Sequence, residues 1–363
     1  MECLGKHDWS SLTTSDLYGL KIDKPNDTIY ALVKKNWDSI AKPIDSMGHF
    51  ETMTARIGAI TGTDVIEISK KAVIIMCADN GIVEEGISQS GQEVTAVVAK
   101  EMADKSSSVC KMAEWIGADT IVVDIGINKA EPIPGVLQKK VRRGTANFKK
   151  EPAMTEEEAV RAIFTGIELV ETCKNAGYHI IAAGEMGIGN TTTSSAIAAS
   201  LLQCEAKEVT GRGAGLSDSG LASKQQIITA VIKKYDLYNA DALTILKTVG
   251  GLDIAGLVGV CIGGALFHIP IVLDGVISMV AALLAERMLP GVREYLLPSH
   301  KGKEPAVTLL MKELKLEPVI DGNMALGEGT GAVMMFALFE MALSVYCNRT
   351  TFSDIQIEQY TRF

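Results

Sequence analysis

The sequence is poor in aromatic residues, in histidine and in clustered positive charge. Phe, Tyr and Trp make up 5% of the 363 residues while apolar residues reach 47%, so the core must be aliphatic. The 35 basic residues are outnumbered by 44 acidic ones, giving a net charge of −9 with no dense basic run. No nucleic-acid partner is expected, because phosphate contacts require clustered Lys and Arg. The five histidines show no metal-ligand spacing such as HxxxH, so no metal site is expected.

Cysteine pairs, a signal peptide and an unbroken apolar span are also missing. The seven cysteines form no CxxC pair and mostly lie in apolar runs, which predicts reduced, buried thiols in a cytoplasmic protein. Residues 1–24 are polar and lack an apolar signal core. Residues 254–273 carry no charge, but Gly263-Gly264 and Pro270 are expected to interrupt them. A buried helix followed by a buried strand fits this run better than a membrane span, so no membrane partner is expected.

Two familiar catalytic patterns are absent as well. Transferases that bind phosphoribosyl diphosphate with Mg²⁺ carry two acids after an apolar strand, whereas Asp124 in the run 122–126 stands alone. No G-x-S-x-G elbow for a serine nucleophile occurs either. Chemistry based on a diphosphate leaving group or on an activated serine is therefore not expected.

What the middle of the chain does contain is a repeated pattern. A short β-branched run leads into a polar, glycine-bearing loop and then into helical spacing, and the runs are 72–76, 120–125, 180–183 and 269–273. Strands that alternate with helices predict an α/β fold with a parallel, Rossmann-like sheet flanked by helices on both faces. In such sheets ligands bind at the carboxyl ends of the strands, where these loops lie.

The two ends of the chain differ from this middle part. The N-terminal residues are polar with helical spacing, and a long apolar helix is expected over 332–346. We expect N-terminal helices (1–65) and a C-terminal helix region (336–363) to join in a small helical lobe. This lobe would pack against an α/β catalytic core (66–335).

Glycine is abundant, with 34 residues, about 9% against a usual level of roughly 7%. Residues 184–192 (GEMGIGNTT) follow an expected strand, and residues 210–216 (TGRGAGL) precede Lys224. Closely approaching backbone N–H groups, a helix N-terminus and a lysine together suit a phosphate group. The alternatives are a tight turn with threonine capping in the first segment and a flexible loop in the second.

A third glycine-rich segment, 326–332 (LGEGTGA), lies between a strand-like stretch and the apolar helix. Its carboxylate, Glu328, is flanked by glycines and adjoins apolar sequence. We expect desolvation to raise the pKa of Glu328 towards the range of a general base. The alternative is that Glu328 only caps the helix.

In these segments the sequence resembles the nicotinate-nucleotide:dimethylbenzimidazole phosphoribosyltransferase family, which builds the lower-ligand nucleotide of cobamides. The resemblance extends from residue 42 to residue 352. Besides the three glycine-rich segments, its most specific parts are 78–81 with 85–86, Lys224, 249–251, 273–275 and 298–300.

The resemblance implies a parallel α/β core, a homodimer with active sites at the ends of the core strands, and no cofactor. Phosphoribosyl would pass from nicotinate mononucleotide to an aromatic base such as 5,6-dimethylbenzimidazole, giving an α-ribotide (α-ribazole phosphate) and nicotinate in cobalamin nucleotide-loop biosynthesis. The pyridinium leaves as nicotinate without protonation or a metal. One carboxylate to deprotonate the azole and one phosphate cradle are therefore sufficient.

The resemblance also assigns roles residue by residue. Glu328 matches the family's catalytic base, and Glu185 matches a second acid near the base and the ribose. Gly187, Gly213 and Lys224 match positions that contact the phosphate.

Four further residues match positions around the two bases. Asp274 and Ser299 match motif loops on the nicotinate and ribose side. Ser90 and Leu326 match positions that line the aromatic acceptor.

The sequence departs from the family's pattern in two places. Asn80 replaces the histidine of a common Asp-His-Gly turn, which is expected to stay intact. Val98 stands where a glutamine often reaches the acceptor pocket, so this pocket is expected to be more apolar. The acceptor therefore stays open between dimethylbenzimidazole, other benzimidazoles, a purine and a phenol. The alternatives for the whole chain are a paralogue that prefers phenolic or purine acceptors, an inactive partner subunit, and a nucleotide-binding sensor.

Overall fold

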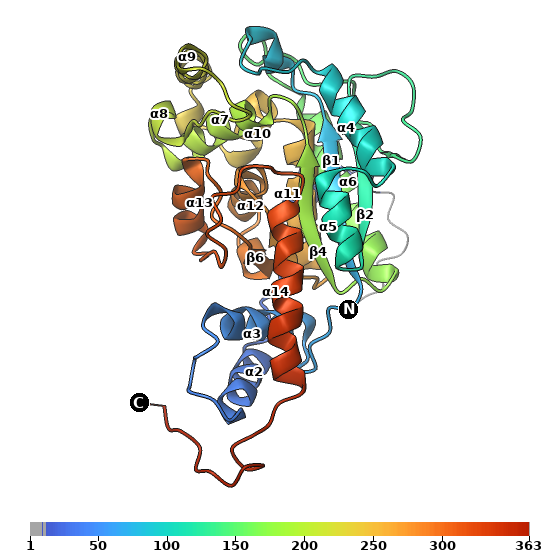
Figure 1. Cartoon of the computed structure of the whole chain (residues 1–363). Coiled ribbons are helices and arrows are strands. Elements are labelled where there is room, and N and C mark those ends of the chain that lie inside the picture. Colours follow the sequence, from blue (N-terminus) through green and yellow to red (C-terminus); the bar gives the residue numbers. More distant parts are fainter. Residues whose placement is uncertain (1–8, 10–11, 363) are drawn as a thin grey trace.

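The computed structural model describes residue 9 and residues 12–362, which form a core built on one sheet with a group of helices at one end (Figure 1). Six parallel strands follow the order β3-β2-β1-β4-β5-β6. This is the strand order of the Rossmann fold, so the predicted α/β class is confirmed. The strands are β1 (Lys71–Ala78), β2 (Ala118–Gly126), β3 (Leu137–Gln138), β4 (Ile180–Met186), β5 (Ile271–Leu273) and β6 (Leu296–Pro298).

Helices connect these strands and complete both ends of the described chain. The α-helices are α1 (Thr14–Gly19), α2 (Asp27–Ser39), α3 (His49–Thr61), α4 (Glu93–Ala103), α5 (Ser108–Trp115), α6 (Glu156–Asn175), α7 (Asn190–Leu202), α8 (Ala206–Val209), α9 (Asp218–Lys234), α10 (Ala242–Val249), α11 (Leu252–Leu266), α12 (Val276–Met288), α13 (Ala306–Leu314) and α14 (Thr330–Cys347). The short 3-10 helices are η2 (Gly81–Glu85), η3 (Leu237–Asn239) and η4 (Val292–Tyr295).

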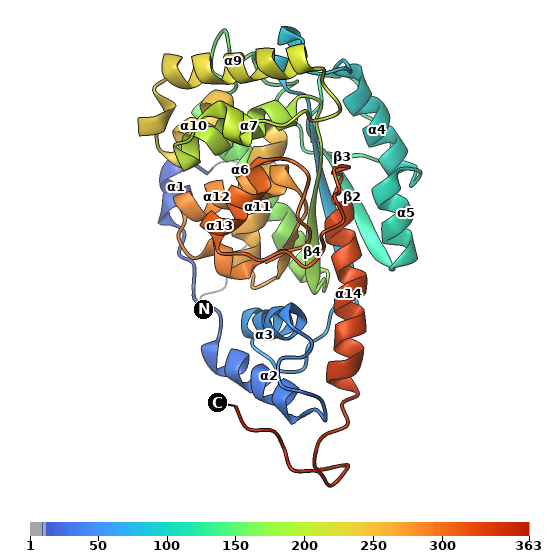
Figure 2. The same ribbon diagram turned by 60° about the vertical axis from the view of Figure 1, so that its left-hand side comes forward.

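Both faces of the sheet are buried, as is usual for parallel strands. Successive side chains of β1 point to opposite faces. Ile74 and Met76 pack with α6, α10, α11 and α12, whereas Val73 and Ile75 pack with α4, α5 and α14. Figure 2 shows these two helical layers on either side of the strands. The sheet is therefore the middle of three layers.

The uncharged run 254–273 folds as most of α11 followed by β5, which confirms the prediction of a buried helix and strand. The pair Gly263-Gly264 does not interrupt the helix, however, and that expectation was wrong. A Cβ on Gly263 would lie 2.8 Å from Val170 of α6, and one on Gly264 would lie 2.3 Å from Ile271 of β5. The two glycines allow α6 and β5 to pack closely against α11.

The strand-like stretch expected before Leu326 is also not a strand. Residues 315–329 form a loop, and their only pairing of this kind is an isolated bridge between Ile320 and His300. β6 is the edge strand and ends at Pro298, and this segment pairs beyond that end through the single bridge alone. Glu328 is therefore carried by a loop that leads directly into α14.

Helices α2 and α3 and the end of α14 lie together below the sheet (Figure 1 and Figure 2). Trp37 packs against Tyr346 with ring centroids 5.3 Å apart, and its indole N–H donates to Thr54 Oγ1 at 2.8 Å. Ile40 forms an antiparallel bridge with Thr351. Segments from both ends of the chain thus contribute to one helical lobe. The domain boundaries given above stay a prediction.

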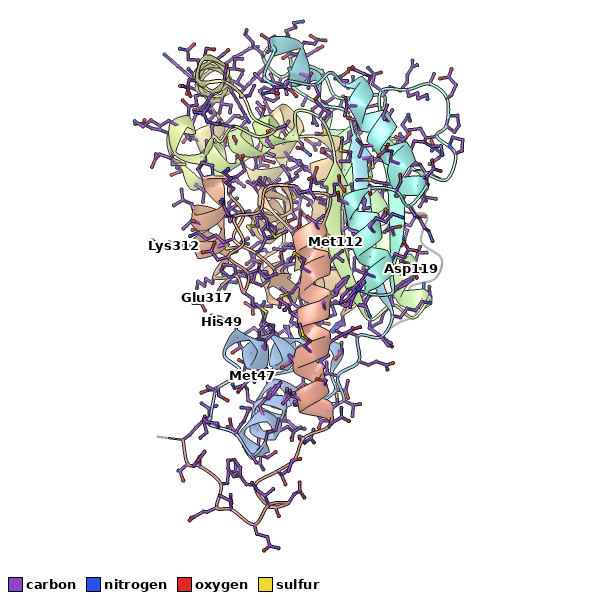
Figure 3. The ribbon with its side chains drawn as sticks, in the orientation of Figure 1. Met47, His49, Met112, Asp119, Lys312 and Glu317 are labelled. Carbon is purple, nitrogen blue, oxygen red and sulfur yellow. The ribbon has the colours of Figure 1, made fainter. Side chains whose placement is uncertain are left out.

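The helical lobe contacts the core through charged side chains as well. His49 at the start of α3 faces Glu317 after α13 (Figure 3), with Nδ1 and Oε2 3.4 Å apart. The Lys71 ammonium in β1 lies 2.5 Å from Glu340 Oε1 in α14. Within the described part of the chain, α14 is the one helix long and apolar enough to cross a membrane. It packs against α3, α5 and β4, which is the environment of a core helix.

The prediction of buried thiols holds for most of the cysteines that the structure describes, but Cys204 is half-buried and Cys347 is exposed. Six are free, and four of these are buried: Cys77, Cys110, Cys173 and Cys261. Cys3 lies outside the described residues, as do residues 1–8, 10 and 11 of the N-terminal stretch judged not to be a signal peptide.

Candidate active site

A cavity of about 210 Å³ lies over the carboxyl ends of β4, β5 and β6. Its wall comes from the loops that follow these three strands, from the glycine-rich loop before α9, and from residues 324–328. Segments that are far apart in the sequence therefore meet at one edge of the sheet. Six of the predicted site residues line this cavity: Glu185, Gly187, Gly213, Asp274, Leu326 and Glu328.

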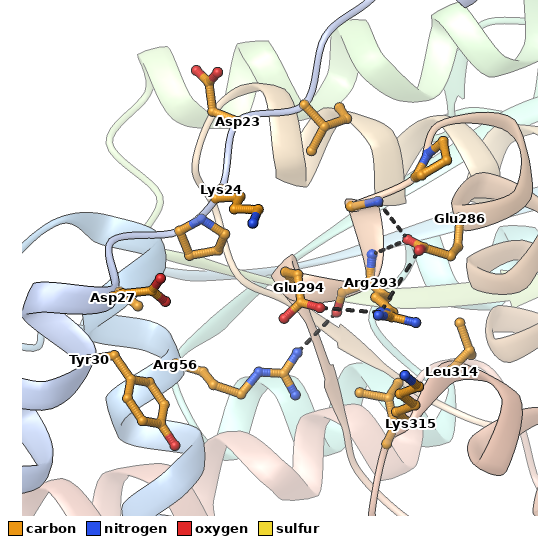
Figure 4. Close-up of a pocket in the computed structure, with 16 residues that line it drawn as sticks. Asp23, Lys24, Asp27, Tyr30, Arg56, Glu286, Arg293, Glu294, Leu314 and Lys315 are labelled. Atoms are coloured by element: carbon orange, nitrogen blue, oxygen red, sulfur yellow. Dashed lines mark hydrogen bonds and ion pairs between the residues drawn. The ribbon is translucent and has the colours of Figure 1, made fainter.

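A larger cavity, about 830 Å³, lies between the helical lobe and the segment around η4 (Figure 4). The arginines and glutamates among its charged groups are engaged within the protein. Arg56 donates to the carbonyl of Arg293 at 3.0 Å, and Arg293 lies 3.2 Å from Glu294. This cavity contains none of the predicted site residues, and η4 precedes β6, so it adjoins the amino end of that strand. Ligands of open α/β sheets bind at the carboxyl ends, which makes the smaller cavity the candidate active site.

Glu328 occupies a left-handed turn just before α14. Its φ is +63°, and those of Gly327 and Gly329 are +85° and +100°. A left-handed conformation costs a non-glycine residue roughly 1–2 kcal/mol, so the two glycines leave Glu328 as the one strained position of the turn. A Cβ on Gly184 would lie 2.4 Å from the Glu328 carbonyl oxygen. The end of β4 therefore needs glycine for the turn to pack against it.

The Glu328 carboxylate is half-buried and reaches a neighbouring helix. Its Oε2 accepts the Val109 N–H at 3.2 Å, near the N-terminus of α5. Glu328 thus contacts the start of α5. The capping alternative had assumed a contact with the start of α14 instead. Burial raises the pKa of Glu328, the Val109 hydrogen bond opposes this, and the charge of Asp274 adds to the rise. The predicted direction is confirmed.

Asp274 fixes the turn that carries Glu328. Its carboxylate accepts the N–H groups of Gly331 at 2.7 Å, Ala332 at 3.2 Å and Gly329 at 3.3 Å. These are N–H groups that the first turn of α14 leaves without helical partners. Asp274 therefore takes the place of an N-cap side chain, and its predicted contact with the donor nucleotide stays a prediction.

Ser299 is buried beneath the cavity, and His300 forms part of the cavity wall. The Ser299 hydroxyl donates to the Leu273 carbonyl at 2.6 Å and lies 3.0 Å from His300 Nδ1. The His300 ring fills the space beside Gly331, where a Cβ would lie 2.0 Å from Nδ1. Ser299 thus supports β5 and His300, and its predicted contact with the donor stays a prediction. Sequence reasoning gave His300 no role, although it stands in one of the recognised segments.

Glu185 ends β4 at the cavity wall and belongs to a buried acid pair. The Asn190 amide donates to Glu185 and also to Asp253 Oδ2 at 3.2 Å, so it bridges the two carboxyl groups. Burial, reinforced by the charge of Asp253, raises the pKa of Glu185 to about 8. Burial also raises the pKa of Asp253 to about 6. Sequence reasoning missed Asp253, because no local signal connects it with a loop 60 residues earlier.

Lys224 is buried beside the two glycine-rich loops. Its ammonium donates to Thr191 Oγ1 at 3.0 Å and to the Gly211 carbonyl at 3.3 Å, and burial lowers its pKa to about 8. The Gly213 N–H donates to Glu304 Oε1 at 3.1 Å. Thr191 and Gly213 both line the cavity. The structure therefore joins the predicted phosphate-binding elements in one anion cradle, defined here as Lys224, Thr191 and the backbone of 211–213.

Comparisons with known proteins agree with this arrangement. The sequence model of the phosphoribosyltransferase family matches residues 22–357. A nicotinate-nucleotide–dimethylbenzimidazole phosphoribosyltransferase of Clostridium perfringens is 43% identical over 333 residues, covering 92% of each chain. One from Acetivibrio thermocellus is 45% identical over 332 residues, covering 91% of this chain and 94% of the relative. This chain belongs to the nicotinate-nucleotide–dimethylbenzimidazole phosphoribosyltransferase family.

Solved structures support the same assignment. The crystal structure of CobT from Thermus thermophilus matches with a TM-score of 0.86 at 34% identity, covering 92% of this chain and all of that one. A crystal structure titled as the nicotinate-nucleotide–dimethylbenzimidazole phosphoribosyltransferase of the same organism matches with a TM-score of 0.86 at 33% identity. The family resemblance inferred from the motifs is thereby confirmed.

Two residues that the phosphoribosyltransferase motifs place at the acceptor do not line the cavity. Val98 of α4 packs among apolar side chains on the α4 and α5 face of the sheet. Ser90 precedes α4, next to Gln89, which donates to the Gly215 carbonyl. Their roles at the acceptor stay predictions. The larger apolar side chains of the wall are Met186, Ile188, Val276, Ile277, Val307, Met324 and Leu326.

Among the described residues, one acidic group has the spacing of a metal site, and it lies in the helical lobe and not in the candidate cavity. It consists of Asp38, Asp45 and Glu51. Lys34 bonds to Asp45 and Glu51, while Arg362 bonds to Asp38 and Asp45. The negative charge there is thus balanced by the protein's own cations.

Proposed function

We propose that this protein transfers phosphoribosyl from nicotinate mononucleotide to an aromatic base, forming an α-ribotide and nicotinate in the assembly of the cobalamin nucleotide loop. The observation that carries the proposal is that a half-buried carboxylate, Glu328, and the anion cradle around Lys224 meet at a single cavity. The names of the relatives point to 5,6-dimethylbenzimidazole as the acceptor.

In this reaction the free ring nitrogen of the azole attacks C1′ of the ribose. The bond from C1′ to the pyridinium nitrogen breaks, and its electron pair stays on the departing nicotinate ring, which becomes neutral. The azole N–H proton passes to Glu328, whose raised pKa suits a general base. Attack on the face opposite the leaving group inverts C1′ and gives the α-ribotide.

The remaining polar groups hold the donor. Lys224, Thr191 and the Gly213 N–H bind the 5′-phosphate, together with the loop at the N-terminus of α7 that contains Gly187. Glu185, with its pKa near 8, keeps its proton at neutral pH. A neutral carboxyl group can donate a hydrogen bond to a ribose hydroxyl without repelling the Glu328 carboxylate.

Replacing Glu328 by Gln tests the assignment of the base. We expect turnover to fall about 10²–10⁴-fold, the usual contribution of a general base. Binding of nicotinate mononucleotide should persist, because Glu328 is not part of the anion cradle. Nicotinate release measured by chromatography gives kcat, and calorimetry gives the donor affinity. Glu101→Gln, which removes a nearby exposed carboxylate, is the matched control. Wild-type kcat in Glu328→Gln would disprove the assignment.

Competition between acceptors tests the choice of base. Dimethylbenzimidazole, adenine and p-cresol are offered together with nicotinate mononucleotide, and the products are identified by mass spectrometry. We expect the benzimidazole ribotide to dominate, because a flat apolar base fits the apolar wall and its N–H supplies the proton for Glu328. A phenolic or purine product alone would favour the paralogue. No product with any base would favour an inactive subunit or a sensor.

We also infer a homodimer located in the cytoplasm. An apolar groove of about 560 Å³ runs between α5 and α14, with Met112 (Figure 3), Trp115 and Met334 among its lining. The Trp115 side chain is 80% exposed, which is unusual for so large an apolar residue unless another surface covers it. A second copy of the chain is the occupant that we propose. The buried thiols and the charged nucleotide substrate support the cytoplasm.

A further inference from the structure

The anion cradle already contains an anion, the carboxylate of Glu304. This residue lies between β6 and α13 and lines the cavity. Its Oε1 accepts the Gly213 N–H at 3.1 Å. A Cβ on Gly211 would lie 2.1 Å from Oε2 and 2.8 Å from Oε1. Both carboxylate oxygens therefore lie directly against the backbone that the sequence motif predicts for a phosphate.

Glu304 has no close cationic partner among the residues that the structure describes. It takes part in no ion pair within 4.0 Å there, and it acts on Lys224 only at longer range. The Lys224 ammonium instead donates to two uncharged oxygens, those of Thr191 and Gly211. A buried ammonium without an adjacent anion is energetically unfavourable. The cradle thus binds the Glu304 carboxylate through the Gly213 N–H, and the Lys224 ammonium still attracts a more highly charged anion.

A phosphate group satisfies the cradle more completely than this carboxylate does. A phosphate monoester has three acceptor oxygens and nearly two negative charges at neutral pH. It can accept hydrogen bonds from the Gly213 N–H, the Thr191 hydroxyl and Lys224 together. Glu304 and the phosphate compete for the Gly213 N–H and repel each other, so both cannot occupy the cradle.

We propose that Glu304 is an internal competitor of the donor's 5′-phosphate, which displaces its carboxylate when the nucleotide binds. The inference rests on the proposed function and extends it to the control of donor affinity. Without substrate, Glu304 keeps the Gly213 N–H paired. After transfer, its return into the cradle promotes release of the ribotide, which carries the same phosphate.

The surrounding backbone allows this exchange without rearrangement of the loop. The Lys303 N–H donates to the Met324 carbonyl at 2.9 Å, and the Glu304 carbonyl accepts the Val307 N–H at 3.1 Å. The main chain on both sides of Glu304 is therefore held in place. Rotation about the side-chain bonds of Glu304 is enough to move its carboxylate out of the cradle.

Removing the carboxylate should tighten phosphate binding. Glu304→Ala and Glu304→Gln are compared with the wild type by calorimetry with inorganic phosphate, and by KM for nicotinate mononucleotide. We expect both the phosphate Kd and the donor KM to fall roughly three- to tenfold, since a competing charge-assisted hydrogen bond is lost. The KM for the acceptor base should not change. Glu313→Gln is the matched control, because it removes an exposed carboxylate of α13 that pairs with Arg287 of α12.

The opposite result would overturn the inference. If Glu304 instead stabilises the shape of the cradle, the phosphate Kd and the donor KM rise in both variants. An unchanged phosphate Kd shows that the carboxylate does not compete with phosphate. Glu304→Gln keeps the size of the side chain, so it serves if Glu304→Ala does not fold. Phosphate binding is measured without an acceptor and without turnover. Tighter phosphate binding in a protein that transfers nothing would therefore refute the proposed function and leave this competition in place.

Discussion

Glu185 shows how burial, reinforced by neighbouring acids, can hold a proton on a carboxyl group at neutral pH. It lies at the end of a buried strand, next to Asp253 and within the influence of Asp274, and its pKa is about 8. Only the amide of Asn190 favours its ionised form directly. Between pH values of about 6 and about 8 the acid pair therefore carries one proton, which links the stability of the fold to pH.

Protein stability should fall as the pH rises towards 8, because of Glu185. Between its ordinary pKa of 4.5 and about 8, the folded protein keeps a proton that the unfolded chain has released. The free energy of unfolding then decreases by up to about 1.4 kcal/mol per pH unit. Urea unfolding at pH 5 to 9 measures this slope, and Glu185→Gln should flatten it. The exposed Glu157→Gln is the control. An equally steep slope in Glu185→Gln would contradict the assignment.

The site residues that the sequence predicted are those that lie in or next to a distinctive loop. Glu328, Glu185 and Lys224 belong to recognisable segments, and the structure places all three at or beside the cavity. Asp253 and Glu304 could not be found in the same way. Asp253 and Glu304 matter because they contact groups that are distant in sequence. A single acidic residue in a sequence does not indicate such contacts.

At the level of secondary structure, the position of the Glu328 turn depends on contact between two backbones. The turn before α14 packs directly on the last residues of β4, where Gly184 leaves room for the carbonyl of Glu328. The three N–H groups bound by Asp274 hold the helix in the same place. A side chain added at Gly184 would meet the backbone of Glu328, which cannot rotate away as a flexible side chain could.

Gly184→Ala should therefore impair catalysis without unfolding the protein. The new Cβ would lie 2.4 Å from a backbone oxygen, so the turn must shift. A displacement of about 1 Å at a catalytic group can cost about 10²-fold in rate, which is the loss of kcat we expect. Steady-state kinetics give kcat, and circular dichroism checks the helix content. Gly19→Ala, where nothing lies within 4 Å, is the control. A kcat within twofold of wild type would show that the contact does not position Glu328.

The strands that the sequence predicted are those buried on both faces. β1, β2, β4 and β5 contain β-branched runs because each lies between two helical layers. β3 has two exposed residues, and β6 (Leu-Leu-Pro) contains no β-branched residue, so neither shows the pattern. The stretch before Leu326 was mistaken for a strand, since apolar residues in a loop over a cavity resemble those of an edge strand.

In the whole molecule, the candidate site lies to one side of the point where the strand order reverses. That point falls between β1 and β4, whereas the cavity covers β4 to β6. The loop after β1 is closed by contact between Gly81 and Thr145, where a Cβ would lie 2.4 Å from the Thr145 carbonyl oxygen. The cavity is thus open beside the loops after β4, β5 and β6, which contain candidate site residues.

The proposed dimer can be tested through the exposed apolar groove. Trp115→Glu places a charge in it, and we expect the variant to sediment as a monomer at concentrations where the wild type is a dimer. Burying an unpaired charge in an interface costs several kcal/mol, enough to weaken association more than tenfold. Val65→Glu changes a 76% exposed side chain outside the groove and should leave the dimer intact. A monomeric wild type, or a dimeric Trp115→Glu, would refute the interface.

Helix α14 joins the sheet to the helical lobe. Its 18 residues span about 27 Å, from the turn of Glu328 to Tyr346 in the helical lobe. Asp274 holds the first turn by three hydrogen bonds. Further along, packing against α5 and β4 and the ion pair between Glu340 and Lys71 hold the helix to the core. Any movement of the lobe relative to the Glu328 turn must therefore break contacts that this helix makes with the core.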